Sequence, residues 1–188
     1  MVLGKIYRFF LSEAGSSKAK CNYLRKQGAE IGEGTVINGN LKTFGTEPYL
    51  IKCGKNCLFA YGVHLVTHDG GVSVLNKLNK YDGKRADIIA KIEIGDNVYI
   101  GTNAMVMPGV RIGSNVVIGA SAVVTHDIPD NSVVVGIPAR VIKTIDEYYE
   151  KHKNRVRFTV GMPLKDKKKY YNNIEWNDLF PADNELDN

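Results

Sequence analysis

Residues 88–124 read IIAKIEIGDNVYIGTNAMVMPGVRIGSNVVIGASAVV, and this stretch decides the fold. An aliphatic anchor returns at every sixth position, and a small or aliphatic residue follows four places later. A strict period of six fits neither a helix nor a simple strand alternation. It indicates a β-helix, in which stacked rungs wind around an apolar column and three hexads complete one coil. The anchors are Ile88, Ile94, Ile100, Val106, Ile112, Ile118 and Val124, and the followers are Ile92, Val98, Ala104, Val110, Val116, Ala122 and Ile128.

Earlier hexads share this register but contain two breaks. The anchors are Ile31, Ile37, Cys53, Phe59 and Leu65. The register is lost over 42–50, where Gly, Thr, Glu and Pro have turn chemistry, and again over 67–87. Long excursions from a compact solenoid are usually functional. We therefore expect the chemistry at the breaks rather than in the regular rungs.

The chain ends predict helices around the coil. Residues 1–28 form a helical segment that stops at Gly28, 29–143 form the β-helix with its excursion at 67–87, and 144–188 form a helical extension. The last rung of a β-helix presents unpaired backbone groups. We therefore expect the C-terminal helices, of which the first is capped by Thr144, to cover it.

Composition favours a soluble cytoplasmic protein with reduced thiols. Of 188 residues 44% are hydrophobic, and the net charge of +5 is concentrated in the basic stretch 151–169. Solvated surface charge is the preferred interpretation, weak association with an anionic membrane or ligand comes second, and nucleic acid is least favoured. The apolar piece at 6–11 is too short for a membrane span and lacks a cleavage site. Cys53 and Cys57 are expected in the core, and the three cysteines, of which Cys21 is the third, show no pattern of a disulfide scaffold or a metal site.

His68 is the candidate catalytic residue, because it opens the second break in the sequence Thr67-His68-Asp69-Gly-Gly. A histidine at the root of a functional loop has a pKa suited to general base catalysis. Either Asp69 or a backbone carbonyl is expected to fix its tautomer. The alternative is a loop histidine that binds local backbone. His64 and His126 lie off the anchor register and should point away from the apolar column.

The hexads, the Thr-His-Asp-Gly loop and the closing sequence Gly-Ile-Pro-Ala-Arg-Val-Ile at 136–142 resemble the hexapeptide-repeat acyltransferases. Among these, the chain is most similar to the sugar and capsular-polysaccharide O-acetyltransferases. The resemblance covers roughly 31–143. It implies an all-β, left-handed parallel β-helix, a homotrimer with active sites between subunits, acetyl-CoA as donor without a metal, and a hydroxyl acceptor. His68 would be the general base.

The resemblance also implies a donor site along the outside of the coils and a general region for the acceptor. Contacts with CoA fall on Ala60, Thr102, Ala120, Thr125, His126, Arg140 and Lys143, of which the last two are basic residues that suit phosphates. Acceptor contacts are expected from Asp69, Glu47, Tyr49 and Tyr61, which lie at the two breaks.

Other functions stay open at this point. The acceptor is expected to be a sugar of a capsule, O-antigen or exopolysaccharide, with a free sugar, an antibiotic hydroxyl or serine as alternatives. A γ-type carbonic anhydrase would use zinc held by three histidines, and the pair His64 and His68 lacks a third partner on a matching rung. A non-catalytic β-helix that serves as an assembly module would not need His68 or its loop.

Overall fold

The structure is a computed structural model that describes residues 2–175 and 178. The chain divides into two units, Met1–Ile145 and Asp146–Asn188. The first unit holds the coil with its N-terminal helices. The second holds most of α4 (Ile145–His152) and all of α5 (Leu164–Asn172). The domain boundaries drawn from the sequence at 28 and 143 stay predictions.

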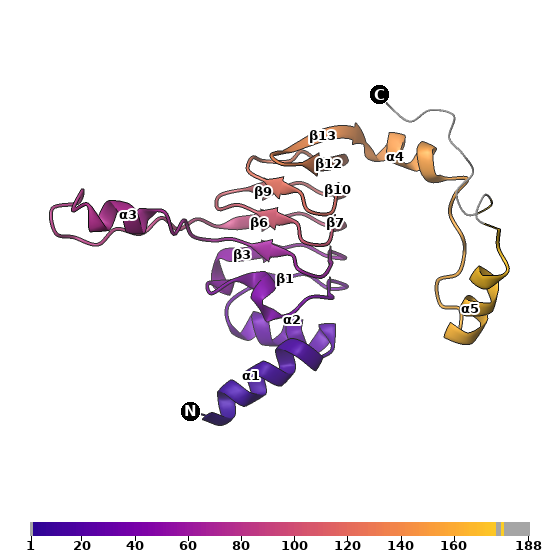
Figure 1. The fold of residues 1–188 in the computed structure, drawn as a ribbon, viewed down its shortest axis with the longest axis horizontal. Helices are drawn as coiled ribbons and strands as arrows, with labels where there is room; N and C mark the ends of the chain where they lie inside the picture. Colours follow the sequence, from indigo (N-terminus) through magenta and orange to yellow (C-terminus); the bar gives the residue numbers. More distant parts are fainter. Residues whose placement is uncertain (1, 176–177, 179–188) are drawn as a thin grey trace. The chain divides into compact units, whose positions relative to one another are not determined.

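Short strands stack into three faces, which we call sheets A, B and C (Figure 1). Sheet A contains β1 (Glu30–Ile31), β3 (Ile51–Cys53), β6 (Ile92–Ile94) and β9 (Arg111–Ile112). Sheet B contains β2 (Val36–Ile37), β4 (Leu58–Phe59), β7 (Val98–Ile100), β10 (Val116–Ile118), β12 (Ser132–Gly136) and β13 (Ala139–Thr144). Sheet C contains β5 (His64–Leu65), β8 (Met105–Val106) and β11 (Val123–Val124).

Apart from β13, strands in each sheet pair in parallel with the strand one coil later. Ile94 pairs with Ile112 in sheet A, and Val106 pairs with Val124 in sheet C. Both steps are eighteen residues, so three hexads complete one coil as the sequence predicted. The result is a parallel β-helix in which each rung buries its apolar side chains only by stacking on its neighbours.

The side chains that face the inside of the coil form the hydrophobic core. Phe59 and Ile100 are fully buried, and Phe59 packs against Phe44 with ring centroids 5.5 Å apart. Cys53 and Cys57 are buried, which confirms the prediction that they are core residues. The predicted followers are buried at every position of the uninterrupted stretch; they are Ile92, Val98, Ala104, Val110, Val116, Ala122 and Ile128.

Ile88 was predicted to be the first anchor of that stretch, and this prediction is wrong. Its side chain is 45% exposed. The Ile88 carbonyl instead accepts a hydrogen bond from the Asp69 N–H, and the Ala90 N–H donates to the Thr67 carbonyl. These antiparallel bonds take the segment around Ile88 out of the coil, so the regular winding resumes only at Ile92.

Corners between sheets A and B repeat one backbone conformation. Asn97, Asn115 and Asn131 each have φ near +57°, a left-handed conformation that asparagine tolerates well. Their side chains form a ladder, in which Asn97 donates to Asn115 and Asn115 to Asn131, both at 2.9 Å. Glycines that follow the anchors have a different role: a Cβ on Gly95 would lie 2.8 Å from the backbone carbonyl carbon of Gly113 on the next rung. The rungs therefore stack closely at these corners.

The two ends of the coil are covered differently. Helices α1 (Val2–Ala14) and α2 (Ser17–Lys26) precede the first rung, and Cys21 and Leu24 of α2 are buried in the core. At the other end, β13 folds back antiparallel on β12. The N–H of Ile145 then donates to the Asn131 carbonyl. Capping of the last rung by the C-terminal helices stays a prediction.

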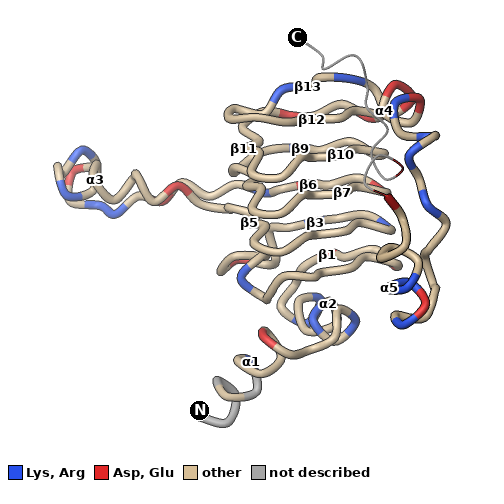
Figure 2. The backbone as a smooth tube through the Cα atoms, turned by 45° about the vertical axis from the view of Figure 1, so that its right-hand side comes forward, with Lys and Arg blue, Asp and Glu red and all other residues tan. Residues whose placement is uncertain are grey.

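The second break, after β5, forms an arm that carries α3 (Val72–Lys77). Figures 1 and 2 both show this arm projecting away from the coil. The first break is shorter and consists of two 3-10 turns, η1 (Leu41–Phe44) and η2 (Pro48–Leu50). Among the described residues, no helix is long and apolar enough to cross a membrane.

Candidate active site

His68 lies at the root of the arm, where the chain leaves the coil. The preceding Thr67 is buried, whereas the His68 side chain is 47% exposed. An antiparallel bridge between His68 and Ile89 holds the backbone at this point. The backbone of His68 is therefore held in place while the imidazole is open to solvent, as general base catalysis on a diffusing substrate requires.

Glu47 is the partner of His68. Its Oε2 atom lies 3.1 Å from His68 Nδ1 and also accepts a hydrogen bond of 2.6 Å from the Thr67 hydroxyl. Its Oε1 atom accepts a bond of 2.6 Å from the Thr46 hydroxyl. Both carboxylate oxygens are thus held, so the position of Glu47 is defined by three neighbouring side chains.

These contacts set the charge of Glu47 and the tautomer of His68. Hydrogen bonds from the hydroxyls of Thr46 and Thr67 hold the pKa of Glu47 below its usual value near 4.5. The group is therefore ionised at neutral pH and can only accept hydrogen bonds. It follows that His68 Nδ1 carries the hydrogen in the neutral ring, which leaves Nε2 with a free lone pair to take a proton.

The tautomer of His68 was predicted to be fixed by Asp69 or by a backbone carbonyl, and the structure shows neither. Asp69 Oδ1 accepts the Gly71 N–H at 2.8 Å in a local turn. Glu47 had been predicted only as an acceptor contact. One signal pointed to this neighbour: each break leads into a strand of sheet A, β3 after the first and β6 after the second, and these two strands pair. Stacking therefore brings the two breaks together.

The predicted donor contacts fall partly at the corner between sheets B and C. Thr102 lies there, one rung after Tyr61, a predicted acceptor contact, whose carbonyl accepts a hydrogen bond from the Asn103 N–H. Ala120 is one rung further on, and Thr102 and Ala120 are exposed. Ala60 does not fit the expected outward contact, because its side chain is buried in the core.

The remaining donor contacts lie elsewhere on the coil. Thr125 and His126 follow β11 at the corner between sheets C and A, where the Thr125 hydroxyl is 2.8 Å from His126 Nδ1. Both are exposed. Arg140 is exposed and Lys143 half-buried on β13, at the end of sheet B. A single chain therefore does not bring the predicted donor contacts into one continuous track.

The two tyrosines lie apart from each other. Tyr61 is 68% exposed and lines a cavity of about 360 Å³ with the buried Lys20. Tyr49 is 61% exposed and lies over Gly28, next to the end of α2. Neither has a recorded bond to His68. Their roles as acceptor contacts stay predictions.

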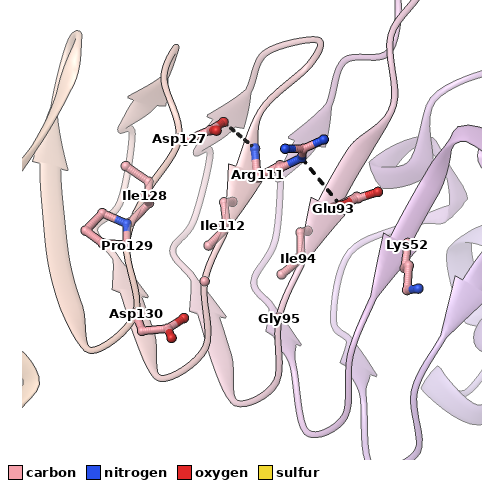
Figure 3. A pocket seen from close by; sticks show the side chains of 11 residues that line it. Lys52, Glu93, Ile94, Gly95, Arg111, Ile112, Asp127, Ile128, Pro129 and Asp130 are labelled. Carbon is pink, nitrogen blue, oxygen red and sulfur yellow. Dashed lines mark hydrogen bonds and ion pairs between the residues drawn. The ribbon is translucent and has the colours of Figure 1, made fainter.

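A groove of about 700 Å³ runs over the outer face of sheet A, and it contains none of the predicted site residues (Figure 3). Charges alternate along it: Glu93 pairs with Arg111 at 3.6 Å, and Asp127 accepts the Arg111 N–H at 2.7 Å. These side chains are largely exposed, so solvent screens their attraction. We interpret this groove as a solvated face of the coil.

Among the described residues, no group of three or more His, Cys, Asp or Glu side chains is arranged to hold a metal ion. The predicted histidine positions are confirmed, since His64 and His126 are both exposed. His64 projects from β5, whereas His126 bonds to its neighbour Thr125.

Known proteins that resemble this chain agree with the observed architecture. Residues 91–126 match the bacterial transferase hexapeptide family (six repeats). Protein CapG of Staphylococcus aureus is 42% identical over 148 residues, which cover 78% of this chain and 84% of CapG.

Two solved structures share the fold. A galactoside acetyltransferase in complex with coenzyme A is 25% identical, with a TM-score of 0.54 over 79% of this chain and 82% of its own. A hexapeptide-repeat containing acetyltransferase from Vibrio cholerae, VCA0836, superposes with a TM-score of 0.55 at 19% identity, over 73% and 86% of the two chains. These matches confirm the resemblance drawn from the repeat, the histidine loop and the closing sequence. The chain belongs to the hexapeptide-repeat family of bacterial acyltransferases.

Proposed function

We propose that this protein transfers an acetyl group from acetyl-CoA to a sugar hydroxyl, with His68 as general base. The observation that carries the proposal is the contact between Glu47 and His68, 3.1 Å between Oε2 and Nδ1. It leaves His68 Nε2 as a free base at an exposed position. The matched galactoside acetyltransferase supports both the donor and the class of acceptor.

In this mechanism His68 moves one proton. Its Nε2 atom takes the proton from the acceptor hydroxyl as that oxygen forms a bond to the acetyl carbonyl carbon. The ionised Glu47 stabilises the imidazolium through Nδ1–H. As the carbon–sulfur bond breaks, His68 returns the proton to the departing sulfur, so that the ester and free CoA thiol are formed. Positioning both substrates beside His68 supplies much of the acceleration.

We propose a homotrimer of left-handed coils, as the family resemblance implies, and the arrangement of the donor contacts supports a site shared between chains. Thr102 and Ala120 lie at one edge of sheet C, and His68 with Thr125 lies at the other. About five residues of extended chain separate the two edges, or roughly 16 Å at 3.3 Å per residue. A donor held between two chains could contact one edge of each. The site would then be completed by a second copy.

The acceptor that we propose is a sugar of a capsule, O-antigen or exopolysaccharide. The loop at 67–71 and the basic C-terminal extension resemble that branch of the family. A cytoplasmic location suits both the donor and the three cysteines, which are buried free thiols.

Release of CoA thiol is expected when the purified chain receives acetyl-CoA and a sugar acceptor. The measurement follows free thiol across nucleotide sugars, oligosaccharides, free sugars, antibiotic alcohols and serine, with mass spectrometry of the product. Thiol release that yields an acetylated glycan confirms the proposal. Turnover with serine or an antibiotic alone would contradict the sugar acceptor but keep the general base. No acetyl transfer to any acceptor would contradict the enzymatic function.

Glu47→Gln is expected to lower kcat by roughly tenfold or more, with little change in KM for acetyl-CoA. The amide keeps the size of the side chain but removes the negative charge that orients His68 and stabilises its protonated form. The control is Glu93→Gln, which removes a carboxylate from the outer face of sheet A and should leave kcat unchanged. Equal kcat values for Glu47→Gln and the native chain would contradict the positioning role.

The native chain and Glu47→Gln should differ in stability only above acidic pH. The folded state lowers the pKa of Glu47, so its carboxylate contributes stability above the unfolded-state value, and that contribution is lost as the pH falls through the folded-state value. The difference in Tm between the native chain and Glu47→Gln should therefore be constant above about pH 5 and shrink toward pH 3. A difference that grows on acidification would show that the hydrogen bonds of Glu47 do not favour its ionised form.

A further inference from the structure

The segment 151–169 of the second unit carries most of the chain's excess positive charge. It contains eight lysines and arginines against one acidic residue, Asp166. The whole chain carries only +5, so the remainder is net acidic. Figure 2 shows the basic positions along the stretch between α4 and α5 and around α5 itself. This concentration is a local feature and not a property of the surface in general.

Helix α5 presents its lysines on one side. Lys165, Lys168 and Lys169 are three and four positions apart, so they share a face of the helix. All three are exposed, and none has a recorded ion pair with a described residue. Near the end of the helix Tyr171 is half-buried, and its hydroxyl lies 3.1 Å from the Thr159 hydroxyl. Helix α5 therefore contacts the preceding stretch through Tyr171 and leaves these three lysines exposed.

The stretch before α5 exposes apolar side chains. Phe158 is 95% exposed and Val160 is 98% exposed, while Thr159 between them is buried. Leu164, at the start of α5, is 83% exposed and neighbours Lys168 on the helix face. If this segment faced only water, Thr159 would be expected to be exposed and Phe158 to be buried. Clustered apolar side chains of this kind mark a surface that meets an apolar partner.

We propose that the segment 151–169 docks on the surface of an anionic lipid membrane. Lysines attract the headgroups, and the apolar side chains of Phe158, Val160 and Leu164 enter the boundary between headgroups and acyl chains. Both features are required for this partner. An acidic glycan would use the lysines but offers no apolar phase for these side chains. A nucleic acid would use the lysines and can stack a base on Phe158, but it offers no apolar phase for Val160 and Leu164. The proposal goes beyond acetyl transfer and does not depend on it.

Co-sedimentation of the full chain with lipid vesicles tests the charged part of this surface. We expect binding to vesicles that contain phosphatidylglycerol, no binding to phosphatidylcholine alone, and loss of binding at high salt. The triple variant Lys165→Glu, Lys168→Glu, Lys169→Glu should bind at least about tenfold more weakly. The control reverses three exposed lysines on the arm, Lys77→Glu, Lys80→Glu, Lys84→Glu, with the same change in net charge. It should bind within about twofold of the native chain.

The apolar part is tested separately with Phe158→Ser, Val160→Ser. This double variant should bind anionic vesicles several-fold more weakly and keep the salt dependence. Its control is Val74→Ser, Leu78→Ser, two exposed apolar residues of the arm. Absence of vesicle binding by the full chain, or equal losses in both triple variants, would overturn the proposal. A third outcome would also overturn it: in the absence of vesicles, the double variant has a lower molar mass than the native chain. Phe158 and Val160 would then contact a second copy of the chain.

Discussion

Replacing His68 with alanine is expected to lower kcat for acetyl transfer by roughly 10²- to 10⁴-fold, the usual contribution of a positioned general base. His68 lies at the root of the arm. Its contact with Glu47 through Nδ1 leaves the lone pair of Nε2 free to take a proton. The substitution should leave KM for acetyl-CoA nearly unchanged. The measurement is steady-state thiol release at saturating donor.

The fold should survive this change. His68 is half exposed, and its recorded side-chain contact is with Glu47 alone among the described residues. Light scattering should therefore give the same molar mass for the variant as for the native chain, three chains in the proposed assembly. His152→Ala, a histidine of the second unit, is the control and should keep full activity. Near-native kcat in His68→Ala would refute the assignment of the general base.

The second large effect is on stability, and it compares two isoleucines that the hexad pattern treats alike. Ile100→Ala is expected to lower the free energy of unfolding by about 2–5 kcal/mol, because its side chain is fully buried between Phe59 and Ile118 of neighbouring rungs. Ile88→Ala should cost less than about 1 kcal/mol, because Ile88 is 45% exposed. Denaturant midpoints and slopes of both variants provide the measurement. Equal destabilisation would show that Ile88 is a rung residue after all.

The hexad pattern predicted the core well, because the direction of a side chain repeats with the rung. Each hexad places its anchor and its follower toward the column, whatever the outward residues are. Buried Phe59 and Cys53, for instance, follow from position alone, although one is large and the other small. The exception, Ile88, satisfies the spacing but belongs to the root of the arm. Backbone pairing with Asp69 outweighs the local pattern there.

The site was predicted in part. His68 could be singled out because it opens a break in the repeat, and an interruption is visible in the sequence itself. Its partner could not, since Glu47 lies twenty-one residues earlier in a turn without periodicity. Ala60 is a different case. Its side chain is buried, and its contact with CoA stays a prediction.

The spacing of apolar residues thus determined the coil, its eighteen-residue winding, the inward positions and the location of both breaks. These properties are local and repeat from rung to rung, so the order of residues encodes them directly. Only the tertiary structure decided that Glu47 meets His68, that Ile88 leaves the coil and that the predicted donor contacts occupy both edges of sheet C. Glu47 and His68 belong to segments that are far apart in the sequence, and backbone pairing with Asp69 takes Ile88 out of the coil. Closure of the coil brings the two breaks together, but the hexad repeat does not specify which side chains meet there.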